Sequence, residues 1–408
     1  MNKLSLTLIF LASSNIAYAS SQTIYQIEQT SSHTLNVSVD RSKHPAETEL
    51  VFRGASMGIA SQVKNVMCDG LAVEEIKSGV WQMPATCQKL QWQIPLRKGD
   101  KELAANQQSI KSGSFMLLSV VSSLPQLQDA ETEIVNITLP NVKTIFPKTD
   151  ATNSIVLPSR ANAPFFILLN PVVVDSITSE NISLNYFLDR PEFATELPAI
   201  HSHMNALKWL NTIIPGRKNE NFSIAWLGIA KEKMALAGAA GEDVLLTNYP
   251  NNGGLKFGKT MLLYVTLHEA FHQFAMQYPD QPSWAAESLA TYYGIRAIEI
   301  ASPNDPDNIA LLQRFKQDGN RFHDGLVTIN RKIKNGDRSE YLAFYTKGLA
   351  FWIAVDEALQ QTQGKRLDYY LLKILQTKYD ADGEPINMQN ILHLSSEKWL
   401  LIQQNFLN

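Results

Sequence analysis

The chain has few of the features that mark several large protein classes. Lys and Arg total 36 against 39 Asp and Glu, a net charge of −3, and no basic block is present. This charge balance argues against a nucleic-acid-binding protein. No apolar run is long enough to cross a bilayer as a helix, and we find no internal repeat or low-complexity segment. We therefore expect a globular protein without a membrane span.

Cysteine is scarce as well, with only Cys68 and Cys87. Two cysteines could hold a metal, but their spacing is long and no histidine lies nearby. We therefore predict a Cys68–Cys87 disulfide, which would stabilise the native state by roughly 3 kcal/mol in the chain-entropy model. Such a bond requires an oxidising compartment.

The N-terminus predicts export. Lys3 precedes an apolar stretch at 4–12, and Ala17-Tyr18-Ala19 forms a small-residue cleavage signal before Ser20. We expect residues 1–19 to be a signal peptide that is removed. Because no cysteine lies near the cleavage point, we do not expect a lipid anchor. The mature protein would then be periplasmic or secreted.

Residues 268–272 read His-Glu-Ala-Phe-His and carry the strongest chemical signal. Two histidines four apart on a helix share one face, so His268 and His272 can bind one metal ion. Zinc suits this pair because it accepts imidazole nitrogen and leaves a position for water. Glu269 would lie beside that position, where a carboxylate can take a proton from the water.

The flanking sequence supports a helix over 259–278, which contains no internal Gly or Pro and ends before Pro282. This segment is apolar nearly all round, so we expect it to be buried. Buried imidazole and carboxylate groups need partners, and a metal ion would supply one.

The third metal ligand defines the class of zinc site. Metzincins need Gly and His at the positions that Ala275 and Tyr278 occupy, so that class is excluded. A second helix is expected to begin at Ser283 and to fold back antiparallel, which brings Glu287 towards the two histidines. Glu287 is therefore the predicted third ligand, with Asp280 and His323 as alternatives.

Three segments together resemble the gluzincin metallopeptidases: the motif at 268–272, the stretch WAAESLATYYG at 284–294, and Tyr345-Thr346-Lys347-Gly348. The chain looks similar to the glycyl aminopeptidase family and, more distantly, to the aminopeptidase N family. This resemblance implies that Tyr345 donates a hydrogen bond to the oxyanion formed during peptide hydrolysis. The alternative interpretation is that Tyr345 is a core tyrosine on an apolar helix with no catalytic role.

Aminopeptidases of these families bind the substrate amine with a glutamate in a Gly-rich segment before the zinc helix. Two positions compete for that role. Glu242 follows a Gly-rich stretch and precedes an apolar run, whereas Gly253-Gly254-Leu255 is followed by Lys256 rather than an acid. If Glu242 serves, an aminopeptidase is possible.

The predicted fold class is α+β with two domains, since 408 residues exceed what one core usually holds. Alternating short runs over 20–190 predict an antiparallel β-sandwich. Residues 191–408 are expected to form a mostly helical, thermolysin-like catalytic domain. Its helices are predicted at 194–213, 259–278, 283–301, 309–318, 341–363 and 367–379, and its strands at 222–229 and 243–248.

These patterns predict an exported zinc metallopeptidase with one Zn²⁺ per chain and a peptide or protein substrate. A peptidase-like interaction protein without activity is the alternative from another class, and hydrolysis of a non-peptide amide is a third. The intact Glu269 favours the enzyme, because a scaffold that only kept zinc would have no need of this base.

Overall fold

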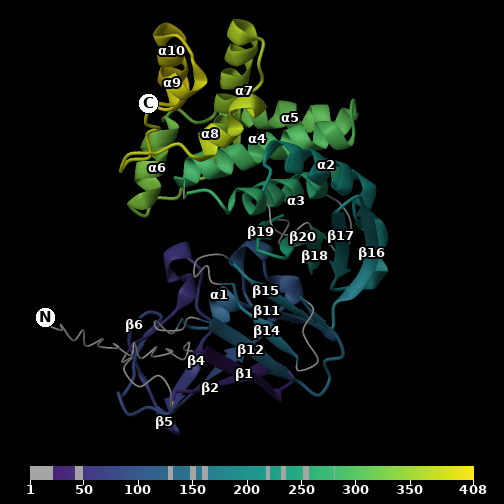
Figure 1. Ribbon diagram of the computed structural model, residues 1–408, viewed down its shortest axis with the longest axis vertical. Helices are drawn as coiled ribbons and strands as arrows, with labels where there is room; N and C mark the ends of the chain where they lie inside the picture. The colour runs from purple at the N-terminus through teal and green to yellow at the C-terminus, as the bar shows by residue number, and fades with distance from the viewer. Residues whose placement is uncertain are drawn as a thin grey trace, which may run out of the picture.

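The computed structural model places two β-sheets facing each other in one half of the molecule and a group of helices in the other, with a further sheet between them (Figure 1). The signal peptide, Lys256 and Asp280 lie outside the residues that it describes. The described residues are 22–41, 49–126, 132–147, 153–158, 164–216, 221–230, 236–250, 257–279 and 281–408.

The first half is built from strands whose residues alternate between buried and exposed. In β2 (Thr34–Asp40), Leu35, Val37 and Val39 are buried while their neighbours are more accessible. These side chains meet those of the facing sheet in one hydrophobic cluster. The larger sheet has the order β14 (Ser154–Val156), β12 (Thr132–Thr138), β1 (Gln22–Ser31), β2, β8 (Lys89–Pro95), β4 (Lys64–Cys68) and β5 (Leu71–Ala72).

The facing sheet has the order β13 (Ile145–Phe146), β15 (Phe166–Leu169), β11 (Phe115–Ser119), β10 (Ile110–Ser112) and β9 (Arg97–Lys98). A small third sheet joins β3 (Glu49–Val51), β7 (Val80–Gln82) and β6 (Glu74–Lys77). The expectation of purely antiparallel sheets is wrong in two places, because β1 pairs parallel with β12 and β10 with β9. β12 is roughly a hundred residues from β1, and two short 3-10 helices separate β9 from β10, so neither pair is joined by a hairpin turn that would impose antiparallel pairing.

The central sheet has the order β16 (Val172–Ser179), β17 (Ile182–Leu188), β18 (Asn221–Ile229), β20 (Leu245–Pro250) and β19 (Gly238–Ala240). Its two faces serve different cores: Leu184 and Tyr186 pack towards the helices, whereas Phe187 packs on the sandwich side. Residues 172–188 therefore belong to the sheet beneath the helices, although the sequence-based division at residue 190 assigned them to the β-sandwich.

The helices that build the site are α3 (Gly258–Ala275), α4 (Ser283–Ala301) and α7 (Ala343–Gln363), with α5 (Pro306–Gly319) beside α7. They follow the predicted helices closely, and the predicted 194–213 divides into η4 (Pro191–Glu196) and α2 (Ile200–Ile213). The predicted 367–379 is shorter, as η6 (Leu367–Tyr370) and α8 (Leu371–Leu375). In the helical half, α6 (Leu326–Lys334), α9 (Met388–Leu392) and α10 (Ser396–Phe406) were not predicted, and neither was the short α1 (Val120–Ser123) in the sandwich half.

Close contact between α3 and α4 depends on Gly294. A Cβ at this position would lie 3.2 Å from the backbone nitrogen of His268, so a larger residue would push the two helices apart. The hydrophobic core around them includes Trp284 and Trp352, which are fully buried. Among the described helices, none is long and apolar enough to cross a membrane.

The predicted disulfide is present. Cys68 ends β4, Cys87 lies just before β8, and the two are bonded with a Cα–Cα distance of 5.6 Å. This distance is in the usual range for disulfides. The bond lies in the sandwich half, and both sulfurs are buried in its core.

Candidate metal centre and active site

Three side chains from two helices converge on one point. His268 and His272 extend from α3, and Glu287 extends from the second turn of α4. The Nε2 atoms of the two histidines are 3.1 Å apart, and Oε2 of Glu287 lies 3.1 Å from Nε2 of His268 and 3.5 Å from Nε2 of His272. The structure thus brings together the three residues that the sequence proposed as metal ligands.

The donor set and spacing fit a zinc ion. Ligand atoms placed on three corners of a zinc tetrahedron are about 3.3 Å apart, close to the three distances observed here. Two imidazole nitrogens and one carboxylate oxygen are also the donors that zinc accepts in catalytic sites. Without a cation, two ring nitrogens that face each other could share only one proton, so the arrangement is better explained as a ligand set.

Thr291 fixes the orientation of His268. Its hydroxyl donates to the backbone carbonyl of Glu287 at 2.8 Å, so its oxygen is left to accept from Nδ1–H of His268 at 3.3 Å. The lone pair of His268 is then on Nε2, which faces the other two ligands. The hydroxyl of Tyr264 also donates to Thr291, at 3.3 Å.

Tyr341 performs a similar role for the carboxylate. Its hydroxyl donates to Oε1 of Glu287 at 3.1 Å, which leaves Oε2 directed at the histidines. Burial alone would raise the pKa of Glu287, but hydrogen bonds with His268 and His272 outweigh it and lower this pKa well below the usual value. Glu287 is therefore ionised, as a metal ligand must be.

Glu269 lies next to the three ligands and faces β19. Its carboxylate packs against Gly238, where a Cβ would be only 2.4 Å from Cγ of Glu269, and it accepts a hydrogen bond from the backbone N–H of Ala240. Burial is the largest effect on its pKa and raises it, despite the opposing effect of the two histidines. A carboxylate with a raised pKa is suited to exchange protons near neutral pH.

Tyr345 borders the same site from α7. Its ring centroid lies 5.5 Å from that of His268 and 5.9 Å from that of Tyr341. Burial, and then the negative charge of Glu287, raise the pKa of the Tyr345 hydroxyl. The hydroxyl therefore remains protonated and able to donate a hydrogen bond.

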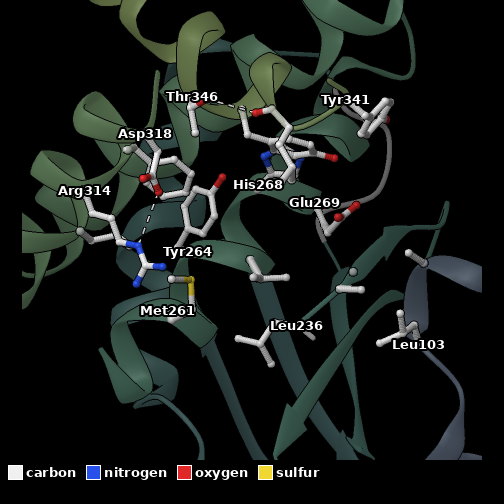
Figure 2. Close-up of a pocket in the computed structure, with 18 of the residues that line it drawn as sticks. Leu103, Leu236, Met261, Tyr264, His268, Glu269, Arg314, Asp318, Tyr341 and Thr346 are labelled. Atoms are coloured by element: carbon white, nitrogen blue, oxygen red, sulfur yellow. Dashed lines mark hydrogen bonds and ion pairs between the residues drawn. The ribbon is translucent and has the colours of Figure 1, made fainter. Parts of the chain in front are cut away.

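A cleft of about 990 Å³ opens over these residues, and His268, Glu269, Tyr341 and Tyr345 line it. Figure 2 shows Tyr264 and Arg314 to one side of His268, and Leu103 to the other. The described walls of the cleft are mostly apolar. Besides the four residues named above, the cleft is lined by Leu103, Ala105, Leu236, Ala237, Gly238, Met261, Tyr264, Val265, Leu311, Arg314, Phe315, Asp318, Arg321, Phe322, Leu342 and Thr346. This size accommodates a ligand of several residues.

Glu242 lies just before β20 and contacts α3 through its backbone. Its backbone N–H donates to the carbonyl of Pro164 at 3.1 Å, and its own carbonyl accepts from Gln273 at 3.0 Å. It is not among the described residues that line the cleft, so the structure offers no support for its predicted contact with a substrate amine. Among the described residues, the alternative ligand His323 does not join the cluster formed by His268, His272 and Glu287.

The sequence reasoning overlooked Thr291 and Gly238. Thr291 was detectable, because it follows Glu287 by four residues and therefore lies one helical turn along the same face of α4. Gly238 carries no comparable signal, because its role depends on how β19 approaches Glu269.

By sequence, no protein-family profile and no curated protein matches this chain. Its structure, however, is similar to those of zinc metallopeptidases of the aminopeptidase N (M1) type, which share its mixed α+β architecture.

Two solved structures illustrate the similarity. An aminopeptidase N family protein from Idiomarina loihiensis has a TM-score of 0.60 at 11% identity, covering 86% of this chain and 70% of that chain. A mutant M1 zinc metallopeptidase from Deinococcus radiodurans, bound to a Tyr-Ser-Ala substrate, has a TM-score of 0.51 at 13% identity, covering 95% and 94%. These TM-scores show a shared fold, and the likeness to glycyl aminopeptidases stays a prediction.

Proposed function

We propose that this chain is a zinc-dependent metallopeptidase that hydrolyses peptide bonds. The observation that carries the proposal is the convergence of His268, His272 and Glu287 on one point with Glu269 beside them. The cleft over this point is large enough for a peptide. The shared fold with M1 zinc metallopeptidases supports the same conclusion.

In this mechanism His268, His272 and Glu287 hold one zinc ion. When bound, zinc supplies Lewis acidity, which makes a water molecule nucleophilic near neutral pH and polarises the substrate carbonyl. Glu269 takes the proton from the attacking water and then delivers it to the leaving amine. Its contact with Gly238 and the hydrogen bond from Ala240 hold this carboxylate in one place throughout.

Tyr345 would stabilise the transition state. The attack of water places negative charge on the former carbonyl oxygen, and a protonated hydroxyl at the edge of the cleft can donate to it. The raised pKa of Tyr345 keeps this donor protonated over the pH range in which a peptidase works. Tyr341 and Thr291 act indirectly, because they orient Glu287 and His268.

We also propose that the protein is exported. The basis is the predicted signal peptide at 1–19, which lies outside the described residues. The Cys68–Cys87 disulfide supports this proposal, because such bonds persist in oxidising compartments. Purification from periplasmic and culture fractions, followed by N-terminal sequencing, would test it.

Metal analysis and two substitutions test the proposed activity. The purified protein should contain about one zinc per chain, and a chelator should stop cleavage of a peptide library followed by mass spectrometry. His272→Ala should abolish tight zinc binding, whereas His201→Ala, an exposed position on α2, should not. Glu269→Gln should keep zinc while turnover falls at least about a hundredfold.

The control for Glu269→Gln is Glu397→Gln, an exposed position at the start of α10. The products of the digest also separate the remaining alternatives. Trimming from free N-termini would identify an aminopeptidase, and internal cuts would identify an endopeptidase. Zinc binding without any chelator-sensitive cleavage would contradict the enzyme and favour an interaction protein.

A further inference from the structure

One wall of the cleft is charged, and the proposed chemistry does not use it. Arg314 and Asp318 lie on α5, and Arg321 follows its C-terminus. Asp318 contacts both arginines, with 3.6 Å to Nε of Arg314 and 2.7 Å to Nη2 of Arg321. A single carboxylate offsets one guanidinium, so this wall keeps a net charge of about +1.

The backbone that carries this wall is held firmly against α7. Gly319 allows the close approach, since a Cβ there would lie 3.1 Å from the backbone carbonyl group of Thr346. Beyond it, Nζ of Lys347 donates to three successive carbonyl oxygens, of Phe322, His323 and Asp324, at 3.4, 3.3 and 2.7 Å. The arginines therefore project from a fixed base next to the helix that carries Tyr345.

The arginine side chains themselves are accessible. The side chain of Arg314 is 50% exposed and that of Arg321 is 75% exposed, whereas Asp318 is 26% exposed. Figure 2 shows Arg314 and Asp318 on the opposite side of His268 from Tyr341. An incoming anion can thus reach both guanidinium groups without displacing a part of the core.

The aromatic rings of Tyr264 and Phe315 connect the proposed metal site with α5. The Tyr264 ring lies 6.0 Å from that of His268, and the Phe315 ring lies 5.1 Å from that of Tyr264. Phe315 is adjacent to Arg314 in α5. The His268 and Phe315 rings are therefore at most about 11 Å apart, a distance that an extended peptide covers with roughly three residues.

We infer that the wall formed by Arg314, Asp318 and Arg321 binds a carboxylate of the peptide substrate. This inference rests on the proposed peptidase function and adds a preference to it: a negative charge within about three residues of the bond that is cleaved. The guanidinium groups match a carboxylate because their paired N–H donors can engage both of its oxygens. Asp318 bridges the two arginines, and all three residues line the cleft.

A carboxylate can come from the peptide C-terminus or from an Asp or Glu side chain. Three matched peptides distinguish these sources: a neutral peptide amide, the same peptide as a free acid, and the amide with Glu in place of Gln. Their affinities are measured by isothermal titration calorimetry on zinc-loaded, full-length Glu269→Gln protein, in which the proposed base is absent and turnover is not required.

We expect one or both charged peptides to bind roughly tenfold more tightly than the neutral amide, since the arginines are partly exposed to water. Arg314→Gln and Arg321→Gln should each remove several-fold of this preference and leave the neutral peptide unaffected. Asp318→Asn should act in the opposite direction, because it frees both guanidinium groups. The matched control is Arg331→Gln, which removes an exposed arginine of α6 that pairs with Asp382. It should leave the affinities for all three peptides unchanged.

Equal affinity for the three peptides, or no peptide binding at all, would overturn the inference. So would a preference that persists in the double variant Arg314→Gln/Arg321→Gln. Hydrolysis without a carboxylate preference would leave the proposed function intact and remove only the inference. A carboxylate preference in a protein that never hydrolyses peptides would contradict the proposed function and leave the binding of a carboxylate at this wall intact.

Discussion

Replacing Gly238 with Ala should disable the enzyme without disturbing the metal site. The backbone of Gly238 is not in the left-handed region, so alanine is allowed there. Its Cβ, however, would lie 2.4 Å from Cγ and 2.8 Å from Oε1 of Glu269. Because carbon atoms in contact are about 3.5 to 4.0 Å apart, Glu269 has to move by about 1 Å.

A shift of this size is expected to lower kcat by roughly a hundredfold, because proton transfer depends on the position of the base. Zinc content should stay near one per chain, because the three atoms nearest to the added Cβ all belong to Glu269 and not to a proposed ligand. The assay is kcat on one peptide, together with zinc analysis and a melting temperature.

Gly241→Ala provides the matched control on the same hairpin. Its Cβ would lie 2.6 Å from the Phe166 ring rather than against Glu269, so we expect lower stability with kcat retained. If Gly238→Ala kept a normal kcat, Glu269 would not be the base or its placement against β19 would not matter. A loss of zinc in Gly238→Ala would likewise refute the reasoning.

Three further predictions concern single groups. Tyr345→Phe should lower kcat by roughly ten- to a thousandfold with KM nearly unchanged, and a normal kcat with a lower melting temperature would assign this tyrosine to the core. Burial lowers the pKa of His203 to about 3, so below about pH 6.5 the unfolded state binds one proton more than the folded state. The free energy of unfolding should therefore fall by about 1.4 kcal/mol for each unit by which the pH is lowered from 6.5 to 3, and His203→Gln should reduce this slope. Reduction of the Cys68–Cys87 bond should lower the free energy of unfolding by roughly 3 kcal/mol, and equal urea midpoints with and without reductant would contradict this.

The sequence was most informative where chemistry and helical periodicity coincide. The motif helix and the turn at Pro282 together predicted α4 with its observed bounds, Ser283–Ala301, although Pro282 rather than Ser283 is at the N-cap and no side chain caps this end. Once these helices were placed antiparallel, Glu287 had to approach His268 and His272, as it does. Local signals were therefore sufficient for the proposed ligand set.

Long-range pairing was beyond the same reasoning. The parallel contact of β1 with β12 joins segments roughly a hundred residues apart, and nothing in either strand specifies its partner. The cleft walls also combine segments that are distant in sequence, because Leu103 comes from the sandwich half and Arg314 from α5. The prediction for Glu242 failed to gain support for a related reason, since a Gly-rich stretch does not reveal which way the following side chain points.

Tyr341, in the turn before α7, and Tyr345, in the first turn of α7, have different uses, although they are only four residues apart. The hydroxyl hydrogen of Tyr341 is directed at Oε1 of Glu287, and this contact keeps Oε2 turned towards the histidines. If Tyr341 donated to the substrate instead, the proposed ligand would lose a partner at the moment when charge develops. Tyr345, whose ring packs 5.5 Å from His268, lines the cleft and also has a hydrogen bond with Glu287. Because Tyr341 already donates to Oε1 of Glu287, this carboxylate keeps a partner if Tyr345 turns to the oxyanion, so we propose Tyr345 as the donor and Tyr341 as the residue that positions Glu287.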